Sequence, residues 1–165
     1  MNNYNVIFES DRILFVKVTD KLIDDYLDMI NDAEVQKFIG LANKTITRKD
    51  ELQWVRDRIK NNTVVFSMIE KETNKFIGNI EMMNIRENTG ELGISITKEQ
   101  QDKHFGQEAI KRILDYAFNE LKLEKVELNV YDFNKRAIHC YEKVGFVKDG
   151  VGKKPNDIRM ITQRK

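Results

Sequence analysis

The sequence predicts a mixed α+β fold with a mostly antiparallel central sheet flanked by helices. Three features indicate it. Short runs rich in β-branched and aromatic residues are separated by turn residues, other stretches repeat apolar residues at helical spacing, and strands and helices alternate in the second half. We expect the element order β-α-α-β-β-β-α-β-α-β-β in a single domain over residues 1–165.

Composition narrows the class of protein. The 165 residues, with 41% hydrophobic and 33% charged side chains, suit one domain with a real core. No apolar run approaches the ~20 residues that cross a bilayer, and the first residues lack the pattern of a signal peptide. One Cys forbids an intrachain disulfide, and two His with one Cys argue against a zinc site. We expect a cytoplasmic protein with no membrane partner and no metal.

Charge is informative through its distribution. The net charge of +1 gives no reason to expect a nucleic-acid partner. Residues 1–34, however, hold eight acidic and three basic side chains, so the remainder is basic. This asymmetry would suit an enzyme that takes a cationic acceptor and an anionic cofactor. The alternative is that the acidic residues form ordinary solvated helix faces.

The first part of the chain reads as a strand followed by two helices. Residues 13–18 form the strand, and Asp20 can cap a helix whose apolar stripe ends at Ile30. Residues 40–46 look like a loop. Thr47 with Asp50 resembles a capping box, which opens a second helix through about Ile59.

Three strands should follow, separated by short turns. They cover residues 64–69, 76–85 and 91–96. In the third, Leu92, Ile94 and Ile96 share one face, whereas Glu91 lies on the other.

The second half alternates helices and strands. A helix follows Gly106 and ends near Leu121, and a strand covers residues 126–130. Asn134 is a good N-cap for the next helix, which Gly145 can end in the left-handed region. Two strands come last. The first begins at Phe146, a loop follows it, and the second covers residues 157–162.

The segment Gln101-Asp-Lys-His-Phe-Gly106 connects a strand to a helix. A loop that turns directly into a helix leaves backbone N–H groups unpaired at the positive end of the helix dipole. Such a terminus is a ready site for a phosphate or pyrophosphate. Gly106 lets the backbone come close to a ligand because it carries no side chain.

This loop and the later segment Asn134-Lys-Arg-Ala-Ile-His-Cys-Tyr-Glu-Lys-Val-Gly-Phe146 together resemble the GNAT superfamily of acyl-CoA-dependent N-acetyltransferases. The family's cofactor loop reads Gln/Arg-x-x-Gly-x-Gly/Ala, which Gln101 and Gly106 fit. The later helix fits the family pattern Asn…Ala…Tyr-Glu-Lys-x-Gly-Phe. The match is good over residues 76–150. Ser10 to Phe15 and Ala33 to Ile39 are similar to the branch with ribosomal-protein N-terminal and spermidine acetyltransferases. The resemblance implies a GNAT-type fold.

The resemblance also implies acetyl-CoA as co-substrate. The pyrophosphate would bind at the loop, and the pantetheine arm would pair with backbone near Ile94 and Ile96, where this strand and the one at residues 126–130 splay apart. Asn134 would bond the pantetheine as well as cap its helix. The cofactor-binding residues implied are Ile94, Ile96, Gln101, Lys103, His104, Phe105, Gly106, Gln107 and Asn134.

His104 departs from the family pattern, because it stands where the first Gly of the loop is usual. Glycine adopts positive φ without strain, whereas His resists it. Its ring would then lie beside a phosphate, or the loop is remodelled and binds the cofactor more weakly.

Acetyl transfer to an amine requires a held thioester, a neutral amine and a proton for the leaving thiolate. Tyr141 lies on the apolar face of its helix, so we expect a buried ring whose hydroxyl reaches something polar. By resemblance, that partner is the cofactor sulfur and Tyr141 is the general acid; a core tyrosine bonded to a carbonyl is the alternative. For the base the resemblance favours Glu91, with Glu81 as second candidate. Either could instead be a surface residue.

The function expected is transfer of an acetyl group from acetyl-CoA to a primary amine by direct attack. A protein N-terminus, a polyamine or another small amine would each serve as acceptor. The rival is a non-catalytic acyl-CoA sensor or regulatory module of the same fold, which would need neither Tyr141 nor a nearby Glu. The oligomeric state is open, with a homodimer as one option.

Overall fold

The structure of the chain is a computed structural model that describes residues 3–165. It has two compact units. The first comprises Met1–Glu81 and Ile94–Phe105, and the second comprises Met82–Gly93 and Gly106–Lys165. The expected single domain over residues 1–165 stays a prediction.

The strands follow the order β1-β2-β3-β4-β5-β6-β8-β7 in a mostly antiparallel sheet, as predicted. β4 and β5 are long enough to contribute to both units. The strands are β1 (Val6–Glu9), β2 (Ile13–Lys17), β3 (Val64–Glu70), β4 (Phe76–Arg86), β5 (Thr89–Ile96), β6 (Lys125–Tyr131), β7 (Val147–Val151) and β8 (Asp157–Gln163).

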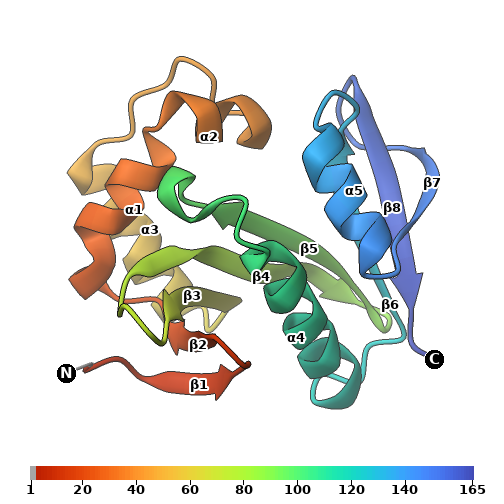
Figure 1. The fold of residues 1–165 in the computed structure, drawn as a ribbon, viewed down its shortest axis with the longest axis horizontal. Coiled ribbons are helices and arrows are strands. Elements are labelled where there is room, and N and C mark those ends of the chain that lie inside the picture. Colours follow the sequence, from red (N-terminus) through yellow and green to blue (C-terminus); the bar gives the residue numbers. More distant parts are fainter. Residues whose placement is uncertain (1–2) are drawn as a thin grey trace. The chain divides into compact units, whose positions relative to one another are not determined.

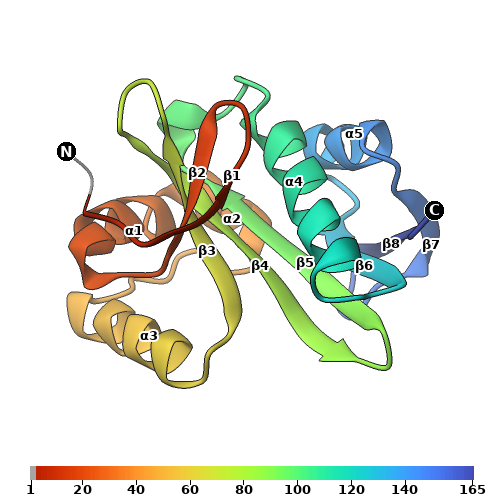
Figure 2. The ribbon, with the colours of Figure 1, turned by 90° about the horizontal axis from the view of Figure 1, so that it is seen from below.

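Three helices belong to the first unit. They are α1 (Ile23–Ile30), α2 (Ala33–Ile39) and α3 (Arg48–Lys60). α1 and α3 lie on the same face of β2 and β3 (Figure 2). They bury Tyr26 and Val55 against Val16 and Ile69, and Trp54 packs on this core. Burying such apolar side chains contributes about 1.5–3 kcal/mol each to the free energy of unfolding, so this cluster holds the helices on the sheet.

β4 and β5 approach each other closely in the first unit. A Cβ atom at Gly78 would lie 2.0 Å from the carbonyl oxygen of Ser95. Only glycine permits this approach, because any side chain would push the two strands apart.

Two elements of this unit were not predicted. β1 is a short edge strand with Val6 and Ile7 exposed, so its side chains show little alternation. α2 is capped by Asp32, whose side chain accepts bonds from two backbone N–H groups, and ends at Gly40 with φ of 78°.

The predicted cap at Asp20 was wrong, because Thr19 caps a 3-10 turn there and α1 begins only at Ile23. The predicted capping box of Thr47 and Asp50 is confirmed.

The second unit carries α4 (Phe105–Asn119), whose first residue belongs to the first unit, and α5 (Lys135–Lys143). Both helices lie on the same face of β6 and β8 (Figures 1 and 2). Along β6, Val126, Leu128 and Val130 are buried, as their predicted alternation requires. The residues between them, Glu127 and Asn129, therefore face away from the helices.

The pairing between β5 and β6 is parallel and short. It joins Thr89 to Lys125, Gly90 to Val126 and Glu91 to Glu127. Among the described residues of the second unit, the ladder stops there, although β6 goes on to pair with β8 as far as Tyr131. Pairing between these strands thus ends at Glu91, and their separation beyond it stays a prediction.

Candidate active site

The predicted site residues fall in both units. The first unit holds Glu81, Ile94, Ile96, Gln101, Lys103, His104 and Phe105, and the second holds Glu91, Gly106, Gln107, Asn134 and Tyr141. The two groups are therefore described separately, joined only where the chain runs from the loop into α4.

The predicted cofactor loop enters α4 through a left-handed backbone. His104 has a φ of 64° and Asp102 a φ of 62°, and α4 begins at Phe105, two residues earlier than expected. His104 therefore adopts the conformation that glycine would take without strain, and its side chain is exposed. The loop keeps a glycine-like backbone although the residue is His.

Arg12 anchors this loop from β2's amino-terminal side. Its guanidinium donates a hydrogen bond to the carbonyl oxygen of Lys103 (3.1 Å) and lies 4.3 Å from the centre of the Phe105 ring. Phe105 is buried, so the first residue of α4 is fixed in the core. A cation above an aromatic ring adds to this anchoring.

A second anchor runs through Gln100, which is buried just before the loop. Its side-chain amide donates to Glu70 of β3 (3.0 Å), and its oxygen accepts from the Lys103 ammonium (2.9 Å). Sequence reasoning missed Arg12, Glu70 and Gln100. Nothing in the local pattern marks them, because Arg12 and Glu70 lie 91 and 30 residues from their partners.

Gln101 turns inward from the loop. Its amide donates to the carbonyl oxygen of Ile96 (3.0 Å). This bond fixes the end of β5 relative to the loop. The Ile96 carbonyl oxygen, which by resemblance would accept a bond from the pantetheine, therefore already accepts one from Gln101.

The end of α5 sets the position of Tyr141. Gly145 has a φ of 107°, as predicted. The N–H of Phe146 bonds to the carbonyl of Tyr141 (3.0 Å) and that of Gly145 to the carbonyl of Glu142 (3.1 Å), which is the Schellman pattern. The hydrophobic contact that accompanies this pattern joins the Tyr141 and Phe146 rings, 5.9 Å apart.

The Tyr141 side chain is half-buried, less than predicted. Burial raises the pKa of its hydroxyl, so the group stays protonated across the working pH range. Among residues 3–165 neither a bond to a core carbonyl nor any other hydrogen bond to this hydroxyl is found, and since no buried side-chain oxygen there lacks a partner, the hydroxyl is not fully enclosed. The arrangement leaves a protonated hydroxyl able to donate to a ligand.

Asn134 caps α5 as expected. Its side-chain oxygen accepts a bond from the N–H of Ala137 (3.3 Å). This bond leaves its side-chain NH₂ for another acceptor.

Glu91 is buried and held by three donors. Asn84 of β4 (2.9 Å), Asn129 of β6 (3.1 Å) and the ammonium of Lys153 (2.5 Å) all bond to its carboxylate. Burial acts to raise the pKa of Glu91, but hydrogen bonds from Lys153, Asn84 and Asn129 outweigh it, and the pKa lies below its usual value. The carboxylate is therefore ionised at neutral pH.

Glu81 has a different environment, within the first unit. Its carboxylate lies 3.7 Å from the guanidinium of Arg58 on α3, and Arg58 in turn lies over the Trp54 ring. The side chain is about a quarter exposed. Glu81 is thus a partnered acid rather than a free surface residue.

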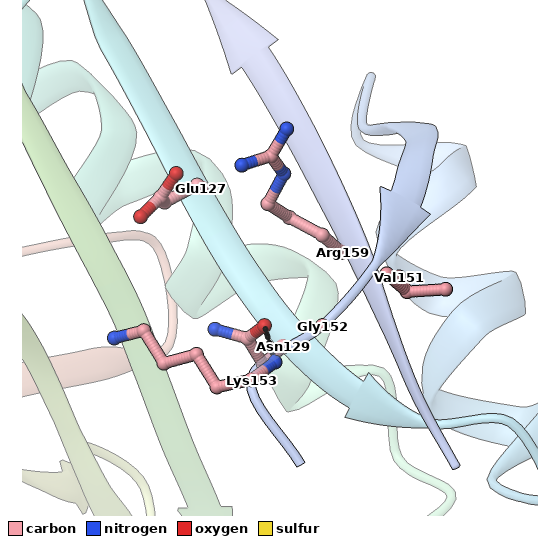
Figure 3. Close-up of a pocket in the computed structure, with 6 residues that line it drawn as sticks. All are labelled: Glu127, Asn129, Val151, Gly152, Lys153 and Arg159. Atoms are coloured by element: carbon pink, nitrogen blue, oxygen red, sulfur yellow. Dashed lines mark hydrogen bonds between the residues drawn. The ribbon is translucent and has the colours of Figure 1, made fainter. Parts of the chain in front are cut away.

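A pocket of about 230 Å³ opens on the face of β6 away from the helices. It is lined by Glu127, Asn129, Val151, Gly152, Lys153 and Arg159 (Figure 3). Lys153 and Asn129 connect this pocket directly to the Glu91 carboxylate. Sequence reasoning missed these lining residues, since nothing links the β7–β8 turn to β5 before folding.

Two further observations concern membranes and metal ions. Within residues 3–165, no helix has the length and apolar character needed to cross a membrane. In the same part of the chain, no cluster of His, Cys, Asp and Glu side chains is suited to hold a metal ion.

Comparison with known proteins defines the class. A model of the acetyltransferase (GNAT) domain matches residues 12–147. The chain therefore belongs to the GNAT acetyltransferase family, and the predicted resemblance and fold are confirmed.

Individual relatives agree. A spermidine N(1)-acetyltransferase of Vibrio cholerae is 36% identical over 104 residues, which is 61% of this chain and only 60% of that relative. A GNAT-family acetyltransferase structure from Bacillus anthracis has a TM-score of 0.84 at 21% identity, covering 94% of this chain and 96% of that one. A spermidine N-acetyltransferase structure from Vibrio cholerae, in complex with CoA and spermine, has a TM-score of 0.81 at 23% identity, covering 92% and 95%.

Proposed function

We propose that this protein is an acetyl-CoA-dependent N-acetyltransferase that acetylates a primary amine. Family membership supports the class of reaction. The observation that carries the proposal is Tyr141, a protonated and half-buried side chain with no hydrogen-bond partner for its hydroxyl among residues 3–165. A module that only senses acyl-CoA has no need of such a group.

Cofactor binding rests on the junction of the loop and α4. Its left-handed backbone at His104 and the N–H groups of the first turn, including Gly106 and Gln107, suit a pyrophosphate. Arg12 and Gln100 hold the loop rigid, so that little entropy is lost when a ligand binds. The residues present therefore fit acetyl-CoA, whose thioester supplies an activated acetyl group.

Tyr141 is the proposed general acid. Its raised pKa keeps the proton on the hydroxyl until a strong base, such as a developing thiolate, can take it. The Schellman turn and the Phe146 ring fix the direction of the side chain. Asn134, at the other end of the same helix, would bond the pantetheine with its free NH₂.

Glu91 is the proposed site for the acceptor's amine. It is ionised at neutral pH and lies where the pairing of β5 and β6 ends. Its lowered pKa makes it a weak base, so it would receive the amine as a counter-ion and pass the proton on through water. Glu81, paired with Arg58, is the second candidate for this role.

The acceptor class proposed is a cationic amine. A spermidine acetyltransferase among the relatives makes a polyamine one candidate, beside a protein N-terminus and other small amines. A homodimer and a cytoplasmic location remain part of the expectation and are not needed for the mechanism.

A panel of amines tests the function. Acetyl-CoA is incubated with the protein and each amine, and release of the free CoA thiol is followed with time. We expect thiol release that depends on one class of amine. Binding of acetyl-CoA without release for any amine would instead support the sensor module.

A further inference from the structure

Two glutamates occupy paired positions at the end of the β5–β6 ladder. Glu91 and Glu127 are direct partners in the parallel register, on strands that lie about 4.8 Å apart. Glu91 bonds to Asn129 and Lys153, and these two residues line, together with Glu127, the pocket on the face of β6 away from α4 and α5. Like charges at paired positions repel each other, so this arrangement needs a cation.

Lys153 supplies that cation, and its ammonium bonds to only one of the two glutamates. The Lys153 ammonium bonds to Glu91 at 2.5 Å. Glu127 has no ion pair among residues 3–165: Lys125 on the same strand makes none, and Arg159 is engaged by Asp149 at 2.6 Å. Glu91, Glu127 and Lys153 together therefore carry one net negative charge.

Lys153 combines a hydrogen-bonded backbone with a charge on an exposed side chain. Its N–H donates to the side-chain oxygen of Asn129 (3.2 Å), which ties the β7–β8 turn to β6. Its side chain is 58% exposed, and an ion pair with so exposed a cation is weak and easily exchanged. Figure 3 shows the Lys153 side chain extending from the β7–β8 turn away from β6, while the Glu127 carboxylate lies further along that strand.

We propose that Lys153 is an internal stand-in for the acceptor's ammonium group. It neutralises Glu91 while the acceptor is absent, and an incoming primary ammonium displaces it from Glu91 toward Glu127. The inference rests on the proposed function, in which Glu91 receives the amine. Lys153 and Glu127 would therefore set the affinity for the acceptor and would take no part in the chemical step.

The test uses methylammonium chloride, the simplest primary ammonium, and needs no acetyl-CoA. Binding is followed through the ¹³C signal of the Glu91 carboxyl carbon, with sodium chloride titrated in parallel as the control for ionic strength. Lys153→Met removes the competing charge and keeps the length of the side chain. We expect it to bind methylammonium about two- to fivefold more tightly, which corresponds to removal of one exposed ion pair.

Two further variants complete the design. Lys154→Met removes the neighbouring charge on the same turn, whose side chain makes no bond to Glu91, and should bind as the wild type does. Glu127→Gln removes the carboxylate toward which Lys153 would be displaced, so it should weaken methylammonium binding by about twofold. In the double variant Glu127→Gln/Lys153→Met this weakening should disappear, because the two residues act through one exchange.

Four results would overturn the inference, and the first three come from comparing the variants. They are unchanged or weaker methylammonium binding in Lys153→Met, an equal gain in Lys154→Met, and a loss from Glu127→Gln that persists in the double variant. No shift of the Glu91 signal in any variant would overturn it as well. Failure of the acetyltransferase proposal would be seen separately, as no thiol release with any amine.

Discussion

At the scale of single residues, the chemistry depends on how neighbours fix Tyr141 and Glu91. Tyr141 is the third residue from the end of α5, where the Schellman turn brings Phe146 against its ring. Glu91 is held by donors from three different strands or turns. One residue offers a proton and the other a fixed negative charge.

Replacing Tyr141 by Phe tests the general acid. The change removes one hydroxyl that has no partner among residues 3–165, so the fold and acetyl-CoA binding should persist. General acid catalysis contributes roughly 10²–10⁴-fold, and we expect kcat to fall at least tenfold in steady-state thiol release. Normal turnover in this variant would leave Tyr141 with a packing role only.

Glu91→Gln tests the residue that receives the amine, with Glu81→Gln as its matched control. The first should be slow at neutral pH and recover partly at high pH, where more of the amine is already neutral. The second should change little. Rates measured from pH 6 to 10 decide between them, and the reverse pattern would move the role to Glu81. If neither variant slows acetylation, the amine loses its proton to water without a dedicated base.

The lowered pKa of Glu91 also predicts how stability depends on pH. A carboxyl whose folded pKa lies below its unfolded value of about 4.3 stabilises the fold above that value, and the stabilisation disappears as pH falls through the folded pKa. Urea unfolding of wild type and Glu91→Gln at pH 7 and at pH 3 should show a difference in free energy that narrows in acid. A difference that stays constant would show that Glu91 is not held as described.

At the scale of elements, the loop before α4 is the most demanding local structure. His104 occupies the left-handed region, where a residue other than glycine costs about 1–2 kcal/mol. Arg12 and Gln100 oppose that cost by fixing the loop on either side. The structure thus maintains the backbone of a glycine loop without the glycine.

His104→Gly should relieve this strain. We expect a gain in stability of up to about 1 kcal/mol, since the added flexibility of the unfolded chain takes back part of the benefit. Affinity for acetyl-CoA, measured by calorimetry, should be kept or improved. His104→Ala is the control, because it removes the ring and keeps the Cβ atom. A large loss of affinity in both variants would show that the ring itself contacts the cofactor.

The elements themselves show which parts of the fold a sequence can predict. The capping box at Thr47, the cap at Asn134 and the left-handed Gly145 were all predicted, because each signal lies within a few residues of its effect. α2 was missed although Asp32 and Gly40 bracket it, because seven residues give too short a period. β1 was missed because an exposed edge strand has no buried face to alternate.

The candidate site was predictable to a similar extent. Tyr141, Glu91 and the loop came from local motifs. The anchors Arg12 and Glu70, and the partners Asn84, Asn129 and Lys153 around Glu91, did not. They meet their partners only across strands, through register and turn geometry that no window of sequence contains.

At the scale of the whole molecule, one acetyltransferase chain carries the proposed pyrophosphate loop, proton donor and amine site. Acetyl-CoA is common to the enzyme and to the sensor alternative, so its binding is the first requirement. A ligand that binds only the folded state raises the melting temperature, by an amount that grows with the ratio of its concentration to Kd.

Calorimetric titration of the protein with acetyl-CoA, paired with a melting curve, is therefore the decisive measurement. We expect saturable binding of one molecule per chain and a melting temperature that rises with acetyl-CoA concentration. Absence of heat and of any shift at millimolar acetyl-CoA would contradict it, because neither the transferase nor the sensor could then operate.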